Sequence, residues 1–166
     1  MPRPSPLPEC LVYSRQNTVP RLRVQAYNYG MAQHINWEDR YSVGDPEMDR
    51  QHSHLLALCN NLADCAATTD LDSDTAFHDI LNELAVYART HFASEEKLLA
   101  DTGYPDLTSH CDDHGSYESD LANFLFTACV SQPDKSAVHR FVLGWWLKHI
   151  LQNDMAYREH LLERSL

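Results

Sequence analysis

The feature that most constrains the fold of this chain is a series of four stretches, from residue 46 onward, that have a helical hydrophobic period. In each stretch apolar residues recur every three or four positions, which is typical of a helix that buries one face. Glycine is scarce, with five residues in 166, and no alternating run of β-branched or aromatic residues indicates a strand. The sequence therefore predicts an all-α protein.

Turn and capping residues separate the four stretches. The first begins at Asp45-Pro46, a capping acid followed by a proline that suits the first helical position. The second begins near Asp72 or Ser73 and ends before Gly103. The third and fourth begin at two further breaks: Tyr104-Pro105-Asp106 and Gln132-Pro133-Asp134. Because short connections make neighbouring helices antiparallel, we expect an up-down-up-down four-helix bundle.

The chain is acidic, with a formal net charge of -11 at pH 7. This charge would repel phosphate backbones and anionic lipid surfaces, and no basic stripe offsets it, so we expect no nucleic-acid partner. No apolar run approaches the roughly 18 residues that span a bilayer, and the N-terminus lacks the apolar segment of a secretory signal. We therefore predict a soluble cytoplasmic protein that does not bind membranes.

Two regions differ in composition. Residues 1–33 hold most of the eight prolines and no sustained apolar period, so they are interpreted as an irregular or disordered leader. Residues 34–166 are long enough for one helical domain with its own core. The five cysteines are scattered and never spaced C-x-x-C, which favours reduced thiols over disulfides or a zinc ribbon: Cys10, Cys59, Cys65, Cys111 and Cys129.

Histidines are frequent, ten in 166 residues, and several fall on the buried faces of the predicted helices. Seven histidines and acids share this position: His52, His91, Glu95, His110, His114, His149 and Asp154. His91 with Glu95, and His110 with His114, have the i, i+4 spacing that points both side chains the same way. One such histidine is usually a core residue bonded to a carbonyl, but seven groups together would leave many buried polar atoms unpaired. We interpret the set as the ligands of a metal centre.

The number and type of these ligands indicate the metal. Seven are too many for one tetrahedral zinc ion, and no thiolate is among them. Imidazole with carboxylate suits iron, and two acids can each bridge a pair of ions. Di-iron carboxylate enzymes use mostly glutamate with Glu-x-x-His pairs, whereas imidazole dominates here. We therefore predict a histidine-rich centre of two non-haem iron ions in the core of the bundle.

Several motifs in residues 34–160 resemble those of bacterial hemerythrin domains. They are Trp37, Val43-Gly44, Asp49-x-Gln51-His52, His91-Phe92-x-x-Glu95-Glu96, Gly103-Tyr104-Pro105, His110-x-x-x-His114 and Trp145-x-x-x-His149-Ile150-x-x-x-Asp154. All seven ligand positions of the family pattern hold the expected residue types. The resemblance implies a hemerythrin-like four-helix domain over residues 34–166.

The resemblance also implies how the ligands are shared. One iron would be held by three histidines: His110, His114 and His149. The other would be held by two: His52 and His91. Two carboxylates, together with an oxo or hydroxo bridge, would link the ions: Glu95 and Asp154. The second iron then has one open position, and the implied function is reversible binding of dioxygen there, for storage, delivery or local supply.

Two other functions remain open at this point. An oxygen-sensing module would act through a separate protein partner, because such domains are typically fused to output domains and the sequence contains none. A di-iron enzyme would reduce peroxide or nitric oxide, or oxidise bound iron. Turnover discriminates these from a carrier, since an enzyme consumes oxidant steadily in the presence of reductant.

Trp146 departs from the hemerythrin pattern, in which a leucine commonly stands three residues before the fourth-helix histidine. On a regular helix, at about 100° per residue, its indole would point between His149 and Asp154, toward the centre. We therefore predict that Trp146 lies at the cofactor and governs the access of oxygen. Tyr117 is expected to be a core residue, and Glu96 is expected to point to solvent. The remaining histidines are expected to be ordinary surface or partly buried residues: His34, His54, His78, His139 and His160.

Overall fold

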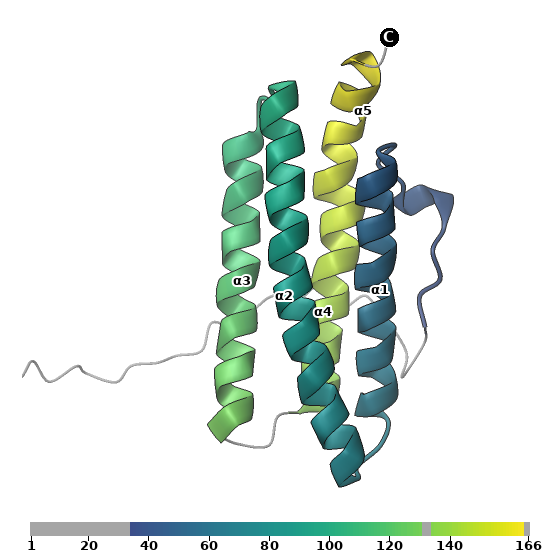
Figure 1. Cartoon of the computed structure of the whole chain (residues 1–166), viewed down its shortest axis with the longest axis vertical. Coiled ribbons are helices and arrows are strands. Elements are labelled where there is room, and N and C mark those ends of the chain that lie inside the picture. The colour runs from purple at the N-terminus through teal and green to yellow at the C-terminus, as the bar shows by residue number, and fades with distance from the viewer. Residues whose placement is uncertain (1–33, 131–133, 165–166) are drawn as a thin grey trace, which may run out of the picture.

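The computed structural model describes residues 34–130 and 134–164. In that part of the chain long helices run side by side along one axis, each antiparallel to the one before it (Figure 1). They are α1 (Pro46–Ala66), α2 (Leu71–Thr102), α3 (Leu107–Val130) and α4 (Lys135–Lys148), which continues through a π-helical turn (His149–Asp154) into α5 (Met155–Arg164). The predicted all-α, up-down-up-down four-helix bundle is confirmed. The predicted leader, residues 1–33, lies outside the described residues.

Side-chain caps fix where three of the helices begin. The Asp45 carboxylate accepts hydrogen bonds from two backbone N–H groups of the first turn of α1, which satisfies donors that the helix itself leaves unpaired. Asp70 caps α2 in the same way, so α2 begins at Leu71, slightly earlier than the sequence predicts. Asp134 caps α4. Gly103 ends α2 in the left-handed conformation, with φ of 67°, as expected for a glycine that stops a helix.

The fourth helix is not regular, contrary to the prediction of one continuous α-helix. Its middle is a π-helical turn from His149 to Asp154, between α4 and α5. Hydrogen bonds in a π-helix join residues five apart and widen the turn, and such turns frequently occur at functional sites. This turn lies at the level of the seven predicted ligands.

The core has two parts, above and below the predicted ligands. The larger part fills most of the bundle and includes Leu55, Phe92 and Tyr117. The smaller part, around Leu99 and Tyr157, closes the end where α2 stops. Along each helix, residues of one part of the core come before the predicted ligands and residues of the other part come after them. Apolar side chains therefore enclose the predicted ligands at both ends along the bundle axis.

A short segment before α1 packs on the bundle and extends the domain beyond the helices. The backbone N–H of Ile35 donates to the side-chain oxygen of Asn60 at 2.8 Å, and the Asn60 amide donates back to the Ile35 carbonyl at 2.9 Å. A short 3-10 helix (Asp39–Tyr41) follows, and its last residue is buried. The Asp49 carboxylate accepts from the Val43 backbone N–H at 2.8 Å.

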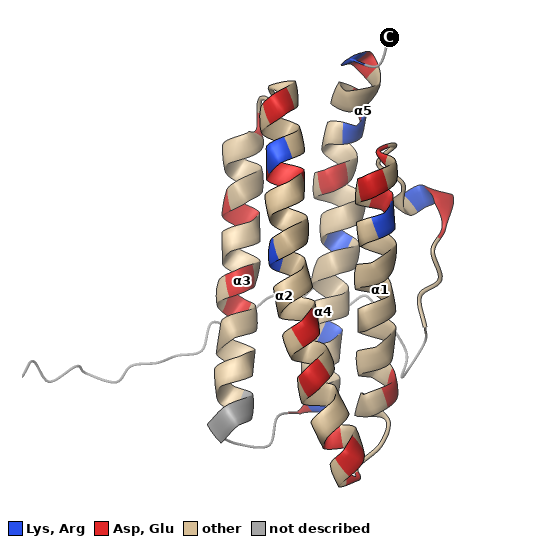
Figure 2. Cartoon of the chain, in the orientation of Figure 1, with Lys and Arg blue, Asp and Glu red and all other residues tan. Residues whose placement is uncertain are grey.

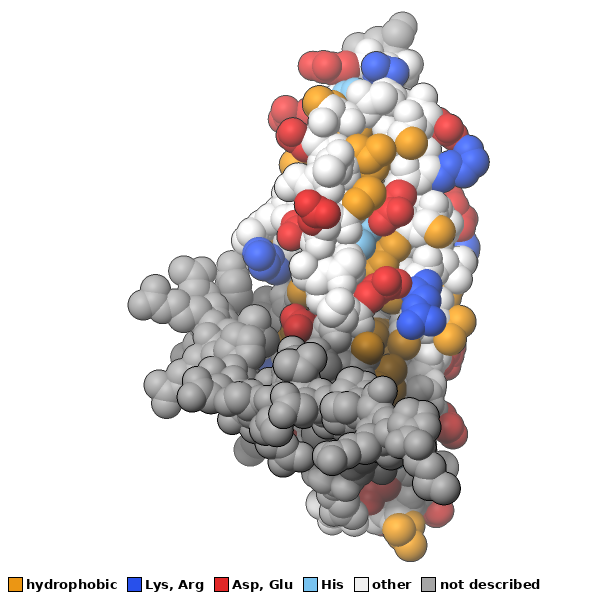
Figure 3. All heavy atoms as spheres, turned by 90° about the vertical axis from the view of Figure 1, so that its left-hand side faces the viewer, with side chains coloured by type: hydrophobic (Ala, Val, Ile, Leu, Met, Phe, Trp, Pro, Cys, Tyr) orange, Lys and Arg blue, Asp and Glu red, His pale blue; other side chains and the backbone are white. Residues whose placement is uncertain are grey.

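Acidic residues outnumber basic ones along the helices (Figure 2). On the face turned to the viewer in Figure 3, acidic side chains lie singly among apolar and uncharged ones. Within the described residues, no helix is both long and apolar enough to cross a bilayer. The exposed charges thus lie on the outer faces of helices whose apolar faces pack against each other in the bundle.

Candidate metal centre

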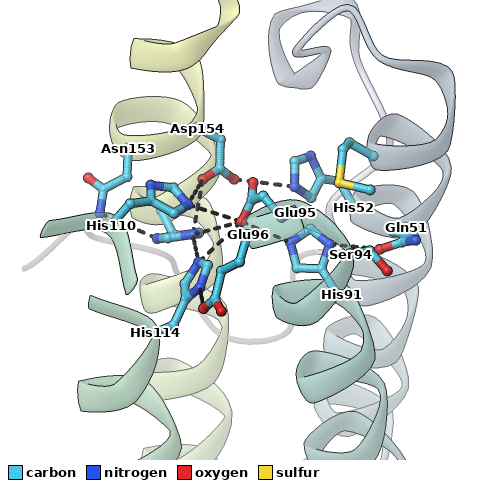
Figure 4. A network of polar contacts seen from close by, with 12 residues as sticks. Gln51, His52, His91, Ser94, Glu95, Glu96, His110, His114, Asn153 and Asp154 are labelled. Carbon is cyan, nitrogen blue, oxygen red and sulfur yellow. Dashed lines mark hydrogen bonds and ion pairs between the residues drawn. The ribbon is translucent and has the colours of Figure 1, made fainter. Parts of the chain in front are cut away.

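The structure brings all seven predicted ligands to one level of the bundle core (Figure 4). Each is buried, with at most 5% of its surface exposed. They come from three of the long helices and the π-helical turn that follows α4: His52 from α1, His91 and Glu95 from α2, His110 and His114 from α3, and His149 and Asp154 from the turn. Two overlapping groups of donor atoms result, and both include Glu95.

The first group contains three imidazoles around one carboxylate oxygen of Glu95. That oxygen, Oε2, lies 3.0 Å from His110 Nε2 and 3.1 Å from His114 Nε2. The Nε2 atoms of His114 and His149 are 3.0 Å apart, and His149 Nε2 lies 3.0 Å from Asp154 Oδ1. Four donors from three helical segments therefore converge on one small volume.

The second group contains two imidazoles and the same two carboxylates. His52 Nε2 lies 3.2 Å from Asp154 Oδ2, and His91 Nε2 lies 3.8 Å from Glu95 Oε2. The imidazole rings of His52 and His91 are 4.8 Å apart and meet edge to face. Since Asp154 turns Oδ1 to the first group and Oδ2 to the second, its carboxylate spans both.

The spacing of these donors fits metal ions. Adjacent ligands of an octahedral ion, each at about 2.1 Å from the metal, lie about 3 Å from each other. Five of the donor pairs named above are separated by 3.0 to 3.2 Å. The spacing therefore matches a site that surrounds an ion on several sides.

Unpaired polar atoms are the second sign that the groups fit metal ions. The fully buried Nε2 atoms of His52 and His91 and both oxygens of Asp154 have no hydrogen-bond partner apart from the short contacts within the donor groups themselves. Buried polar groups without a partner are costly, and buried carboxylates more so. Two cations bound among these atoms would satisfy them and neutralise Glu95 and Asp154.

The electrostatics of the protein side chains are uneven. Burial lowers the pKa of His91 to about 3, which leaves its imidazole neutral. Burial would also lower the pKa of His149, but Asp154 and Glu95 raise it to about 10. Burial and Glu95 act to raise the pKa of Asp154, but His149 and His52 lower it to about 2. Without a metal, a proton on His149 therefore partly balances the two carboxylates.

Comparison with known proteins decides what this arrangement is. The family model of the Hemerythrin HHE cation binding domain matches residues 43–161, which include all seven residues of the two donor groups. The chain belongs to the hemerythrin family.

Individual relatives of this hemerythrin domain agree in length as well as in sequence. A bacteriohemerythrin from Clostridium acetobutylicum is 30% identical over 124 residues, which cover 73% of this chain and 96% of that protein. A hemerythrin-like protein from Naegleria gruberi is 29% identical over 124 residues, with coverage of 75% and 91%. The crystal structure of a wild-type hemerythrin superposes with a TM-score of 0.70 at 26% identity, and covers 78% of this chain and 98% of that one.

Two side chains that the sequence did not single out as functional orient His91 in this hemerythrin domain. The amide nitrogen of the buried Gln51 donates to the Glu47 carboxylate at 2.7 Å, which fixes the amide with its oxygen inward. That oxygen lies 3.0 Å from His91 Nδ1 and accepts its proton. Nδ1 of His91 therefore carries the hydrogen, and Nε2 presents a free lone pair to the second group.

Glu96 orients His114, which corrects the prediction that it points away to solvent. Its Oε1 accepts a hydrogen bond from His114 Nδ1 at 2.8 Å, although 37% of the side chain is exposed. Glu96 lies one position after a predicted ligand, and its flexible side chain reaches back across the α2–α3 seam. It places the lone pair of His114 Nε2 toward the first group, as a carboxylate partner does for a metal-bound histidine.

Tyr157 is a third partner that sequence reasoning missed. Its fully buried hydroxyl donates to Glu95 Oε1 at 2.6 Å, so only Oε2 of that carboxylate faces the histidines. The available signal was its position three residues after Asp154, one turn along the same helical face. Tyr157 thus fixes the orientation of the carboxylate that both donor groups share.

The aromatic residues near the predicted ligands are placed as follows. Trp146 is fully buried, its ring centre lies 5.6 Å from that of His91, and its indole N–H donates to the Tyr117 hydroxyl at 3.0 Å. Tyr117 is a buried core residue, as predicted.

His54 has 43% of its side chain exposed and lies 3.8 Å from Glu83.

The other predicted bystanders lie away from the donor groups. Among the described residues, neither group includes any of the remaining histidines: His34, His54, His78, His139 and His160. The cysteines with described side chains are free thiols, of which only the first is fully buried: Cys59, Cys65 and Cys111. The side chains of Cys10 and Cys129 lie outside the described residues.

Proposed function

We propose that this hemerythrin domain holds two non-haem iron ions, linked by an oxo or hydroxo bridge, and binds dioxygen reversibly. The observation that carries the proposal is the pair of buried donor groups, one with three imidazoles and the other with two, that share Glu95 and are spanned by Asp154. The metal binding and oxygen binding of the hemerythrin family support it. A bound pair of ferrous ions would supply the electrons that dioxygen takes up reversibly.

The protein residues have distinct tasks in this proposal. Three histidines would hold the first iron: His110, His114 and His149. Two would hold the second, which leaves room for a further ligand: His52 and His91. Glu95 and Asp154 would link the ions. Their two negative charges would partly balance the charge of the ions, and the ions would in turn stabilise the buried carboxylates. Glu96 and Gln51 keep protons on the outward nitrogens of the imidazoles, so that the inward nitrogens stay free.

The apolar side chains around the second group would keep water out, since all the enclosing core residues named above are buried. Trp146 is the largest of the fully buried side chains and meets the ring of His91 edge-on. Its hydrogen bond to Tyr117 holds the indole in place, so the ring is a fixed wall. We propose that Trp146 controls the passage of dioxygen to the second iron and shields the bound form from water.

An absorption spectrum of the reduced, iron-loaded protein before and after exposure to air tests this function. Reversible binding predicts a ligand-to-iron charge-transfer band that appears with oxygen, decays slowly, and vanishes when oxygen is removed. Steady consumption of oxygen or nitric oxide in the presence of reductant would contradict it and indicate an enzyme. Trp146→Leu should change the association rate of azide by several-fold at unchanged iron content.

A further inference from the structure

Three oxidisable side chains pack in one cluster against the rings of the proposed iron ligands. They are Trp145 and Trp146 on α4 and Tyr117 on α3. Trp145 lies over His149 from the first donor group, and Trp146 lies against His91 from the second. The cluster therefore contacts both halves of the proposed centre.

The contact between Trp145 and His149 is the closest of these. The two rings are stacked, with centroids 4.3 Å apart and an interplanar angle of 16°. Parallel rings at this distance overlap across their faces, which couples them electronically far better than an edge contact does. By comparison, Trp146 meets His91 at 5.6 Å with an angle of 60° and His149 at 6.2 Å with an angle of 88°.

The three residues of the cluster are also close to each other. Trp145 lies 4.1 Å from Tyr117, ring centre to ring centre, and 5.0 Å from Trp146. Trp146 and Tyr117 are joined by the hydrogen bond between indole N–H and hydroxyl. An electron removed from any one of them is therefore readily replaced from its neighbours.

Only one member of the cluster reaches the surface. Tyr117 and Trp146 are fully buried, whereas Trp145 is partly exposed. Burial raises the pKa of the Tyr117 hydroxyl well above its ordinary value, so Tyr117 cannot easily shed the proton that an oxidised tyrosine must lose. Of the three residues only Trp145 is partly exposed, so its oxidised indole can pass its proton to solvent more easily than the two buried residues can.

We propose that Trp145, through its stack on His149, is the port by which electrons reach the iron site from the surface. It thereby protects the ligand histidines from oxidation when the protein meets peroxide. This inference goes beyond oxygen binding but rests on the proposed iron centre. Phe92, which stacks on His114 at 3.9 Å, is not easily oxidised and offers no such route.

The electron count of the proposed step balances with hydrogen peroxide as the oxidant. Reduction of one peroxide to two waters takes two electrons and two protons. In a centre where only one of the two irons is still ferrous, that iron gives one electron, and Trp145 gives the other through His149. The indole N–H of Trp145 provides one proton and water provides the second. A reductant of the thiol or ascorbate class then returns one electron and one proton to the tryptophan radical.

Mass-spectrometric mapping of oxidised residues tests the route, with iron content measured first. The full-length protein, loaded with iron or with zinc, is treated with hydrogen peroxide without reductant. Trp37 is the matched control, because it is also partly exposed but packs against Tyr41, in the segment before α1. We expect oxidised Trp145 to exceed oxidised Trp37 by about fivefold or more with iron, and the two to be similar with zinc, since exposure alone then sets their reactivity.

Trp145→Phe gives the second test, because phenylalanine keeps a ring over His149 but does not donate an electron. Oxidation should then shift to Trp146, Tyr117 and the ligand histidines, and iron should be lost faster under peroxide. A melting temperature close to wild type shows that the variant is folded. A chain that loads no iron contradicts both the proposed function and the route. Two irons with equal oxidation of Trp145 and Trp37, or unchanged oxidation of the ligand histidines in Trp145→Phe, would overturn the route alone.

Discussion

At the scale of single residues, the outward nitrogens of the imidazoles determine what the inward nitrogens can do. A carboxylate accepts the proton of His114 Nδ1, and an amide oxygen accepts that of His91 Nδ1. Because neither acceptor can donate in its observed orientation, both imidazoles are held in the tautomer that frees Nε2. The charged partner belongs to the three-histidine group and the neutral partner to the two-histidine group, so the two proposed iron sites differ in their surroundings as well as in their ligands.

Glu96 gives a test of this arrangement. Glu96→Ala removes the acceptor of the His114 proton, so we expect the affinity for ferrous ion to fall by about 10- to 100-fold, as for other partners of metal-bound histidines. Glu96→Gln, which keeps an oxygen but loses the charge, should lie between Ala and wild type. Glu118→Ala is the control, because Glu118 is similarly exposed, at 43%, and lies near Arg89 instead of a histidine. Equal affinity in Glu96→Ala and Glu118→Ala would show that the contact has no role.

The proton on His149 predicts how iron binding depends on pH. Its pKa of about 10 in the metal-free protein means that the imidazole is charged at pH 8, whereas a metal ligand must be neutral. Loading with ferrous ion should therefore release about one proton at pH 8, and the apparent affinity should rise by about tenfold per pH unit between pH 7 and 9. Calorimetry in two buffers of different ionisation enthalpy measures the release. If no proton is released at pH 8, the metal does not displace a proton from His149.

The set of residues that converge in the core was predictable from the sequence, and their hydrogen-bond partners mostly were not. His91 and Glu95, like His110 and His114, are four residues apart on the apolar face of a helix. Their burial can therefore be predicted from the sequence pattern without knowledge of tertiary contacts. The contact of Glu96 with His114 joins different helices and depends on where a flexible side chain turns. A position on the edge of a helix face gives no signal of that direction.

At the scale of elements, the π-helical turn solves a spacing problem that regular helices leave unsolved. His149 and Asp154 are five residues apart, which places them about 140° apart on a regular helix. In the turn their donor atoms Nε2 and Oδ1 lie 3.0 Å apart. The prediction that both residues bind the same iron ion already conflicted with their separation around a regular helix. Because a regular helix was assumed, this conflict went unnoticed. Helix ends were predicted more closely, since capping acids and Gly103 mark them chemically.

The cap of α1 carries a prediction at this scale. Asp45→Ala removes the acceptor for the backbone N–H groups of Glu47 and Met48, so we expect the metal-free protein to lose about 1 kcal/mol of unfolding free energy. Denaturant titration of the metal-free protein measures the loss. Asp39→Ala is the control, because Asp39 is exposed and starts only a short 3-10 helix. A change in Asp39→Ala as large as that in Asp45→Ala would attribute the effect to surface charge instead of capping.

At the scale of the whole molecule, the layer of predicted ligands lies between the two parts of the core. This layer holds two buried carboxylates and five imidazoles, which a bundle core does not stabilise by itself. Binding of metal ions there would join the upper and lower parts of the bundle, so folding and metal loading are expected to be coupled. All of the groups that contribute lie between residues 34 and 164.

Removal of the leader tests this limit of the domain. Deletion of residues 1–30 should leave iron content and melting temperature nearly unchanged, because the segment has no helical period and no predicted ligand. Iron analysis and a thermal melt of the loaded protein measure both. A large loss of either would show that the domain extends further toward the N-terminus than residue 34.

The proposed di-iron centre is tested most directly by the number of ferrous ions bound when the metal-free full-length chain is titrated without oxygen. We expect two per chain in wild type. We expect about one in His52→Ala, which removes a proposed ligand of the two-histidine group alone, and an unchanged number in His54→Ala, whose side chain faces outward. One iron per chain in wild type, or a preference for a single zinc ion, would contradict the di-iron centre.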